Sequence, residues 1–319
     1  METSGRDSES GTVTLHALSA GHFTLPEYQF ISPVVETARR TVPSLAFLIQ
    51  HANKSGRITR IVFDLGLRRD TNRYAEPIRK YITTRRPMTT RPDVVEGLAR
   101  GGLTPRDIDY VIYSHVHWDH IGEPRDFPDS IFIVGYGALD LRSGAGAKLR
   151  GGHPFFEHDL LPESRTIELS DPKEERGVSS AHQSSVQNFD TTRALTAFKH
   201  LPNTLDLFGD GSVLIVDAPG HLAGHINISV KVTDDRHVYL AGDAFHDRRL
   251  LTGEKDIGTW RDVEGHVCCI HADRQTAAET IDRIRKLELD GVEVIAAHDP
   301  EWENLNQCRF FGVTIETQP

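Results

Sequence analysis

A chain of 319 residues with 38% hydrophobic and 26% charged residues has the composition of a folded protein with a sizeable core. Its formal net charge of −10, without a basic patch or tail that stands out, argues against a general affinity for nucleic acid or anionic membranes. The three cysteines do not suggest a disulfide framework, the first dozen residues lack the apolar core of a secretory signal, and no apolar run approaches the length of a membrane span. We therefore expect a single cytoplasmic domain over residues 1–319, with a disordered start at residues 1–12.

Short apolar runs bounded by turn residues predict several strands in the first half of the chain. Residues 44–51 and 58–65 form a predicted hairpin around a turn at residues 52–56. Residues 21–31 are apolar and aromatic but contain Pro26, so they form either a strand or a loop. The next expected elements are a short helix at 91–99, closed by Gly101 and Gly102, and strands at 108–113 and 130–134.

The regular pattern is lost between residue 135 and about residue 206. This stretch holds glycine-rich segments and a polar, serine-rich run at residues 168–188. It is either a solvated insertion or a lid that shapes a substrate pocket, and the residues do not decide between the two.

Strands are predicted again in the second half, at residues 211–217, 226–232, 237–241 and 292–297. Asp273 is a suitable N-cap for a helix in which apolar residues recur at helical spacing, namely Ala278, Ile281, Ile284 and Leu287, and which ends near Gly291. Strands precede a helix in both halves, which suggests two similar αβ halves that face each other.

Three imidazoles and a carboxylate lie within six residues directly after the strand predicted at 108–113. Side chains two apart on an extended segment point the same way, so His115 and His117 can bind one ion. Asp119 and His120 follow after a turn and can face a second point nearby. Neutral imidazole and ionised carboxylate are ligands that suit zinc and similar divalent cations.

Three further strands end in a histidine or an aspartate. His221 follows Pro219-Gly220 at the end of one strand, and we favour it as a ligand over His225, four residues later. Asp243 and His298 end two other strands, where a carboxylate is costly to bury unless it meets a cation. We therefore predict two metal sites with Asp243 between them, and their other ligands are His115, His117 and His221 in the first and Asp119, His120 and His298 in the second.

Together these motifs resemble those of the metallo-β-lactamase superfamily, over roughly residues 40 to 300. The resemblance rests on the H-x-H-x-D-H run at 115–120, on Ala218-Pro219-Gly220-His221, on Gly242-Asp243 and on Ala297-His298. It implies an α/β fold, the four-layer αββα sandwich, with a centre of two zinc ions at one edge of the sheets. Asp64 matches the family's early strand-end aspartate, which suggests that it orients a ligating histidine.

Within the superfamily the motifs are most similar to the acyl-homoserine lactonases and their fungal lactonase-like relatives. Those lactonases carry a tyrosine three residues after the bridging aspartate, whereas this chain has His246 there. His246 either takes over contact with the substrate carbonyl or is an exposed loop residue.

The predicted activity is the opening of a small cyclic ester by a hydroxide held between two zinc ions, with iron or manganese as alternative metals. Asp119 or His246 is the candidate that supplies the proton to the leaving group. A γ-lactam, a cyclic carbamate such as a benzoxazolinone, and a thioester are alternative substrates, and a scaffold without turnover ranks low because no ligand is missing. The sequence leaves the oligomeric state open, a dimer included. Residues expected to shape the pocket are Trp118, Phe23, Tyr28, Phe30, Phe155 and Phe156.

Overall fold

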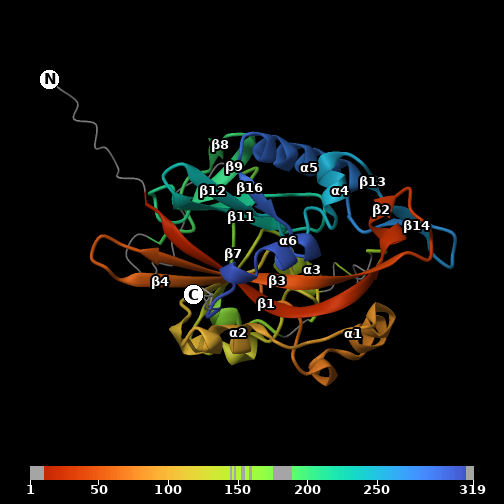
Figure 1. The fold of residues 1–319 in the computed structure, drawn as a ribbon, viewed down its shortest axis with the longest axis horizontal. Coiled ribbons are helices and arrows are strands. Elements are labelled where there is room, and N and C mark those ends of the chain that lie inside the picture. The colour runs from red at the N-terminus through yellow and green to blue at the C-terminus, as the bar shows by residue number, and fades with distance from the viewer. Residues whose placement is uncertain are drawn as a thin grey trace, which may run out of the picture.

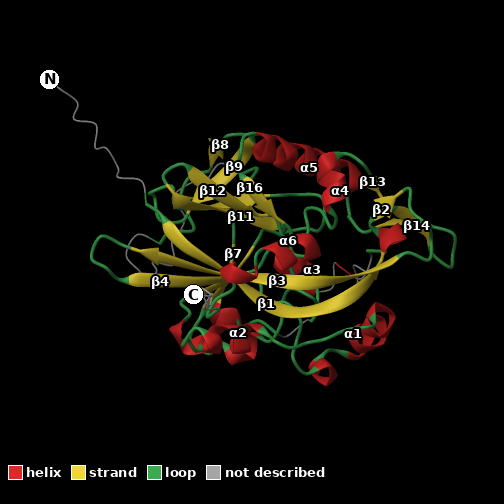
Figure 2. Cartoon of the chain, viewed as in Figure 1, coloured by secondary structure: helices red, strands yellow, loops and turns green. Residues whose placement is uncertain are grey.

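Two six-stranded sheets face each other, and helices cover the outer face of each (Figure 1). The computed structural model describes residues 11–143, 146, 149–151, 155–157, 160–174 and 189–313. Figure 2 shows the four layers in section, with α4 and α5 over one sheet and α2 beneath the other. The predicted αββα sandwich is therefore confirmed.

The first sheet has the strand order β1-β3-β4-β5-β6-β7. The β1–β3 and β3–β4 pairs are antiparallel, and the remaining pairs are parallel. Its strands are β1 (Val13–Pro26), β3 (Arg39–Ala52), β4 (Ile58–Phe63), β5 (Tyr110–Ile112), β6 (Ile131–Val134) and β7 (Thr166–Glu168). The predicted hairpin forms with Ala52 opposite Ile58, and residues 21–26 belong to a strand rather than a loop.

The second sheet has the order β16-β12-β11-β10-β9-β8 and is antiparallel except for the β12–β16 pair. Its strands are β8 (Thr196–Phe198), β9 (Leu201–Asp206), β10 (Val213–Asp217), β11 (Ile226–Thr233), β12 (Arg236–Leu240) and β16 (Glu293–Ile295). Two small pairs lie outside the main sheets: β2 (Ile31–Ser32) with β13 (Asp256–Ile257), and β14 (Thr259–Arg261) with β15 (Val267–Cys269).

Side-chain caps define the two helices that the sequence predicted. The helix expected at 91–99 is α2, which starts with a capping box between Asp93 and Glu96. The Asp273 carboxylate caps α5 by accepting from the backbone N–H of Thr276. The helices are α1 (Glu76–Tyr81), α2 (Val94–Arg100), α3 (Ala138–Arg142), α4 (Arg248–Thr252), α5 (Arg274–Leu289) and α6 (Pro300–Leu305).

The stretch from 135 to 206 contributes strands to both sheets, which its composition did not predict. β7 forms one edge of the first sheet, while β9 and β8 form the corresponding edge of the second. The serine-rich residues 175–188 lie outside the described residues, and a lid function for this stretch stays a prediction.

Backbone hydrogen bonds join the two halves beside the strand ends that carry histidine and aspartate. The N–H of Leu45 donates to the carbonyl of Ala297 at 2.9 Å, and the N–H of Ile226 donates to the carbonyl of Ser114 at 2.8 Å. Gly242 has a φ of 48°, and a β-carbon there would lie 2.8 Å from the β-carbon of Ser114. Glycine is therefore required for the loops of the two halves to approach this closely.

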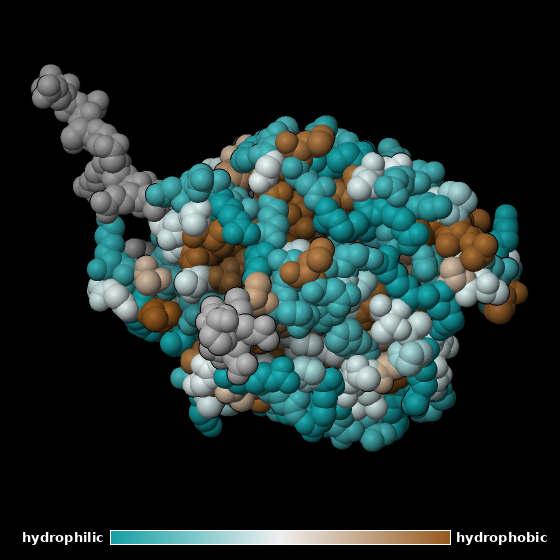
Figure 3. Space-filling view, in the orientation of Figure 1, coloured by the Kyte–Doolittle hydropathy of each residue, from teal (hydrophilic) through white to brown (hydrophobic). Residues whose placement is uncertain are grey.

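The surface seen in Figure 3 is mostly hydrophilic, with hydrophobic atoms at the end where β2 and β14 lie in Figure 1. Exposed apolar residues near these strands are Val35, Val263 and Val267. Among the described residues, no helix is both long enough and apolar enough to cross a bilayer. The oligomeric state stays a prediction.

Packing between the sheets predicts a large difference between two isoleucines of the same strand. Ile61 of β4 is fully buried in the cluster between the sheets, whereas Ile58 is 41% exposed. We expect Ile61→Ala to lower the free energy of unfolding by about 2–5 kcal/mol, because it leaves a cavity. The matched control, Ile58→Ala, should cost about 1 kcal/mol or less. Urea unfolding followed by circular dichroism measures both, and equal losses would contradict the sandwich core.

Candidate metal centre

The six-residue run at 115–120 leaves the end of β5 as an extended segment and then turns back. The N–H of His120 donates to the carbonyl of His117 at 3.1 Å, which closes the turn. His115 and His117 therefore face one point, and Asp119 and His120 face another, as the spacing predicted. All four side chains are buried.

The first donor group combines His115, His117, His221 and Asp243, whose nearest ligand atoms all lie within 4.8 Å of one another. The Nδ1 of His117 lies 2.7 Å from the Nε2 of His115 and 3.2 Å from the Nε2 of His221. The Oδ2 of Asp243 lies 3.7 Å from the Nε2 of His115 and 3.6 Å from that of His221. Three nitrogens and one oxygen in this arrangement suit a tetrahedral zinc ion.

The second donor group combines Asp119, His120, His298 and the other oxygen of Asp243. The Oδ1 of Asp243 lies 3.2 Å from the Nε2 of His120 and 3.1 Å from the Nε2 of His298. These three atoms are buried and make no hydrogen bond with any described residue. Because unsatisfied polar atoms rarely converge in a dry interior, the residues present fit a bound divalent cation.

Burial and neighbouring charges favour the metal-binding protonation states of His115, His221 and Asp243. Burial lowers the pKa of His115 and His221 well below that of an exposed imidazole, so both rings are neutral. Burial alone favours the neutral acid at Asp243, but His298 and His120 hold the pKa of its carboxyl well below the usual range. Neutral imidazole and ionised carboxylate are the forms that coordinate metals. At His120 and His298 the Asp243 carboxylate raises the pKa in spite of burial, so a bound cation would take the place of a proton there.

Asp64 contacts the histidine run through its carboxylate, and its backbone has a conformation that few residues adopt. Its φ is 62°, and its carboxylate accepts from the backbone N–H of Ser114 at 2.7 Å and from the Ser114 hydroxyl at 2.7 Å. It also lies 2.9 Å from the Nδ1 of His120, which leaves the Nε2 of that ring facing Asp243. A carboxylate behind a histidine fixes its orientation and raises its basicity, as the sequence suggested for Asp64.

Both ring nitrogens of His225 form hydrogen bonds with backbone groups. Its Nδ1 lies 3.0 Å from the carbonyl of Ala218, and its Nε2 accepts from the backbone N–H of Asp243 at 3.1 Å. His225 therefore braces the loop that carries Asp243, while His221 faces the first donor group. Gly220 adopts a φ of 123°, as expected for the sharp turn before His221.

His246 is buried beside the donor groups, so it is not an exposed loop histidine. Its Nε2 lies 3.0 Å from the Oδ2 of Asp243, and its ring packs against Phe30. His246 also forms a third cluster with His221 and His271. The sequence analysis missed His271, because the strand before it, β15, is too short to be predicted.

A narrow cavity of about 30 Å³ opens on the donor groups. Three of the six aromatic residues expected there, Phe23, Phe30 and Trp118, do line it. The other three, Tyr28, Phe155 and Phe156, lie outside its lining. Phe155 packs on Tyr81 and Phe156 on His117. Residues not foreseen in the lining are Leu25, Tyr81, Arg85 and Ile270. The cavity has room for about one water, so a larger substrate requires some of these side chains to rotate.

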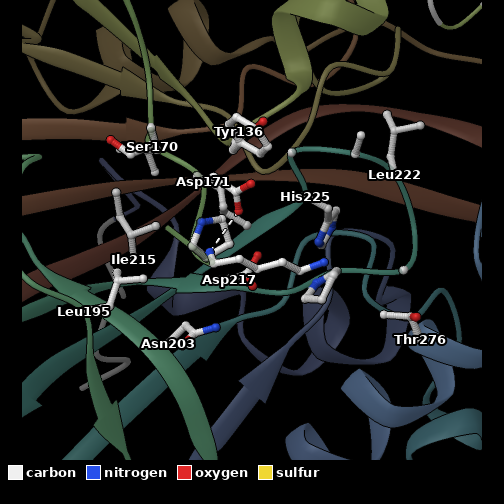
Figure 4. A pocket seen from close by; sticks show the side chains of 18 of the residues that line it. Tyr136, Ser170, Asp171, Leu195, Asn203, Ile215, Asp217, Leu222, His225 and Thr276 are labelled. Atoms are coloured by element: carbon white, nitrogen blue, oxygen red, sulfur yellow. Dashed lines mark hydrogen bonds between the residues drawn. The ribbon is translucent and has the colours of Figure 1, made fainter. Parts of the chain in front are cut away.

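A larger cavity of about 480 Å³ lies behind the loop that carries His221 and His225. Figure 4 shows Asp217 and Asn203 on its sheet side, with Tyr136 and Leu222 opposite them. Its described lining contains none of the residues of the two donor groups, although it includes Gly220 and Leu222, the neighbours of His221.

Comparison with known proteins agrees with this geometry. A family profile described as the metallo-beta-lactamase superfamily matches residues 39–298. Among curated relatives, cytochrome P450 monooxygenase mpaDE of Penicillium roqueforti is 28% identical over 96% of this chain and 35% of its own length. Metallo-hydrolase mfmC of Annulohypoxylon moriforme is 31% identical over 66% of this chain and 50% of its length. Gamma-lactamase FDB1 of Fusarium pseudograminearum is 27% identical over 70% of this chain and 50% of its length.

The chain spans between about a third and a half of the length of these relatives. Among solved structures, a quorum-quenching N-acyl homoserine lactone lactonase superposes with a TM-score of 0.64 at 19% identity, over 95% of this chain and 98% of that one. The dizinc quorum-quenching lactonase AidC superposes with a TM-score of 0.55 at 13% identity, over 91% and 89% of the two chains. These structures share the fold. Because the family profile covers most of its length, the chain belongs to the metallo-beta-lactamase superfamily.

Proposed function

We propose that the protein is a metal-dependent hydrolase that opens a small cyclic ester, with two zinc ions per chain held by the two donor groups. The observation that carries the proposal is the position of Asp243, which presents one oxygen to each donor group. The likeness to a fungal gamma-lactamase and to lactonase structures supports a cyclic ester or amide as the substrate.

A pair of divalent cations supplies two things to such a reaction when bound: hydroxide near neutral pH and polarisation of the substrate carbonyl. His115, His117 and His221 would hold one ion, and Asp119, His120 and His298 would hold the other. Their histidine-rich donor set favours zinc, while iron and manganese suit imidazole and carboxylate as well.

The residues of the chain then handle the proton and the carbonyl oxygen. Ring opening forms a bond from the carbonyl carbon to a water-derived oxygen and breaks the ring C–O bond, so the leaving oxygen needs a proton. Asp119 lines the cavity and belongs to the second donor group, so its carboxylate is placed to pass a proton to the leaving oxygen. His246 lines the same cavity and can donate an N–H to the carbonyl oxygen as negative charge develops there.

A γ-lactam or a cyclic carbamate is the second candidate substrate. Its support is the fungal gamma-lactamase relative, and the same arrangement of residues serves the cleavage of a C–N bond. Parallel assays with lactones, γ-lactams, cyclic carbamates and thioesters on zinc-loaded protein would decide among them. Turnover of thioesters alone would overturn the proposal.

Removing a donor residue should abolish turnover. We expect the variants His117→Ala and Asp243→Ala to bind fewer than two zinc ions per chain and to lose measurable lactone hydrolysis. Each substitution removes one ligand atom or more from the donor groups. Elemental analysis and a hydrolysis assay measure both effects. The control is His200→Ala, at a histidine that pairs on the surface with Asp290. Full activity in either site variant would refute the proposed centre.

Replacing the Asp64 carboxylate should weaken metal binding without breaking the fold. Asn tolerates a positive φ, so Asp64→Asn keeps the backbone conformation but loses the charge behind His120. We expect a loss of about tenfold to a hundredfold in zinc affinity, measured by competition with a chromophoric chelator. Asp210→Asn is the matched control. Asp210 also makes a carboxylate–imidazole contact, in this case with His51 of β3. Equal affinity in the two variants would mean that Asp64 is only structural.

His246 should affect the rate more than the metal content. His246→Phe keeps a ring in the cavity but removes the N–H, and we expect kcat to fall about tenfold to a thousandfold with two zinc ions retained. His246→Tyr restores a donor and should recover part of the rate. Wild-type kcat in the phenylalanine variant would remove His246 from the mechanism.

A further inference from the structure

Arg85 is a buried cation in the wall of the metal-facing cavity. It ends the 3-10 turn Ile82–Arg85, which continues directly from α1, and it is 4% exposed. The turn is anchored by Ile78 and Ile82, which pack in the apolar cluster that also contains Trp118. Arg85 lines the same cavity as His246 and the metal-binding candidates. This side chain is therefore held next to the place where a substrate would bind.

The partners of Arg85 within the described residues are all neutral. Its Nη2 donates to the Oε1 of Gln29 at 3.1 Å and to the hydroxyl of Tyr81, and its Cζ lies 4.7 Å from the centre of the Tyr81 ring. Among the described residues, no ion pair joins a carboxylate to this guanidinium. Arg68, which is equally buried, contrasts with it, because its guanidinium faces Glu123 at 3.6 Å and Glu157 at 3.3 Å.

A buried guanidinium without a carboxylate partner is unfavourable, because arginine stays charged and loses part of its hydration. An anion that enters the cavity would offset this cost with charge-assisted hydrogen bonds, which arginine makes to carboxylates in pairs. Bound divalent cations would outweigh the charges of Asp119 and Asp243, so the loaded cavity has a net positive charge. Charge and geometry therefore both favour an anionic ligand over a neutral one.

We propose that Arg85 binds a carboxylate on the substrate, remote from the bond that is hydrolysed. This inference rests on the proposed hydrolase function and narrows its substrate class to cyclic esters or amides that carry an acidic group. The rings of Phe23, Phe30 and Trp118 line the cavity together with Arg85, which suits a flat apolar ring between the two polar ends. The long arginine stem can rotate, so the guanidinium can follow the carboxylate as the cavity widens.

The test compares dihydrocoumarin with its carboxyl-substituted derivatives, each of which differs from it by one carboxyl group. Zinc-loaded wild-type protein should prefer at least one carboxylated lactone by about tenfold to a hundredfold in kcat/KM, mainly through a lower KM. Arg85→Gln should reduce this preference at least tenfold, because it lowers kcat/KM for the carboxylated lactone far more than kcat/KM for dihydrocoumarin. Arg85→Lys keeps the charge but not the paired donors, so it should retain part of the preference.

Arg86→Gln is the matched control, since Arg86 is the next residue, is exposed and does not line the cavity. It should keep the full preference. Thermal unfolding and zinc content of each variant show whether it is folded and loaded, and Arg85→Lys provides the test if Arg85→Gln does not fold. The inference is overturned if wild-type protein has no preference, or if Arg85→Gln slows both lactones by the same factor.

Failure of the proposed hydrolase function gives a different result. If neither lactone is hydrolysed, both serve as ligands, and calorimetric titration of the zinc-loaded protein measures their binding. Binding of a carboxylated lactone that Arg85→Gln weakens at least tenfold supports the anion site even without turnover. Equal binding by wild type and Arg85→Gln, or no binding of any carboxylated lactone, overturns it.

Discussion

The carboxylate of Asp243 has imidazole nitrogens of five histidines within 3.7 Å of its oxygens, in a part of the molecule that is closed to solvent. Such a concentration of polar groups is costly to bury, because hydrogen bonds among imidazoles satisfy few of their nitrogens. The surrounding structure offsets part of this cost by holding the rings from behind. Asp64 and Ser114 contact the ring nitrogens that face away from the centre, as does the backbone carbonyl of Pro43 at His298.

The donors come from both halves of the sandwich, so the centre depends on how the two sheets dock. The run at 115–120 follows β5 of the first sheet, whereas His221, Asp243 and His298 follow strands of the second. The hydrogen bonds of Leu45 and Ile226 across the junction set the spacing between these loops. Because a metal bound here contacts both halves, its binding free energy adds to the stability of the folded chain.

The part of the cavity wall that faces the two donor groups comes largely from segments outside the loops that carry them. Phe23 and Leu25 lie on the far end of β1, and Tyr81 and Arg85 lie on the α1 segment. A superfamily fold carries many reactions, and the residues of the individual site decide among them. In this chain the cavity combines an aromatic wall, His246 and an arginine that has no carboxylate partner among the described residues, and the two proposals above rest on these features.

The order of residues along the chain was sufficient to predict two facing αβ halves, the strands that end in a histidine or an aspartate and the membership of both donor groups, while the four-layer sandwich followed from the resemblance to a known family. Those features depend on local patterns, since apolar runs form strands and the residue after a strand lies at the sheet edge. Strands at the edges of the sheets, such as β7 and β8, were not predicted, because three residues without a clear alternation carry too weak a pattern.

The sequence favoured His221 over His225, but the physical reason appeared only in the folded structure: both follow the same strand, and they differ in what their ring nitrogens contact. The burial of His246, the contact of His271 with His221, and the entry of Arg85 into the cavity are likewise contacts between segments far apart in the chain. No local pattern encodes such contacts. They follow from the docking of the two sheets and of α1 against β1, and therefore appear only once the chain is folded.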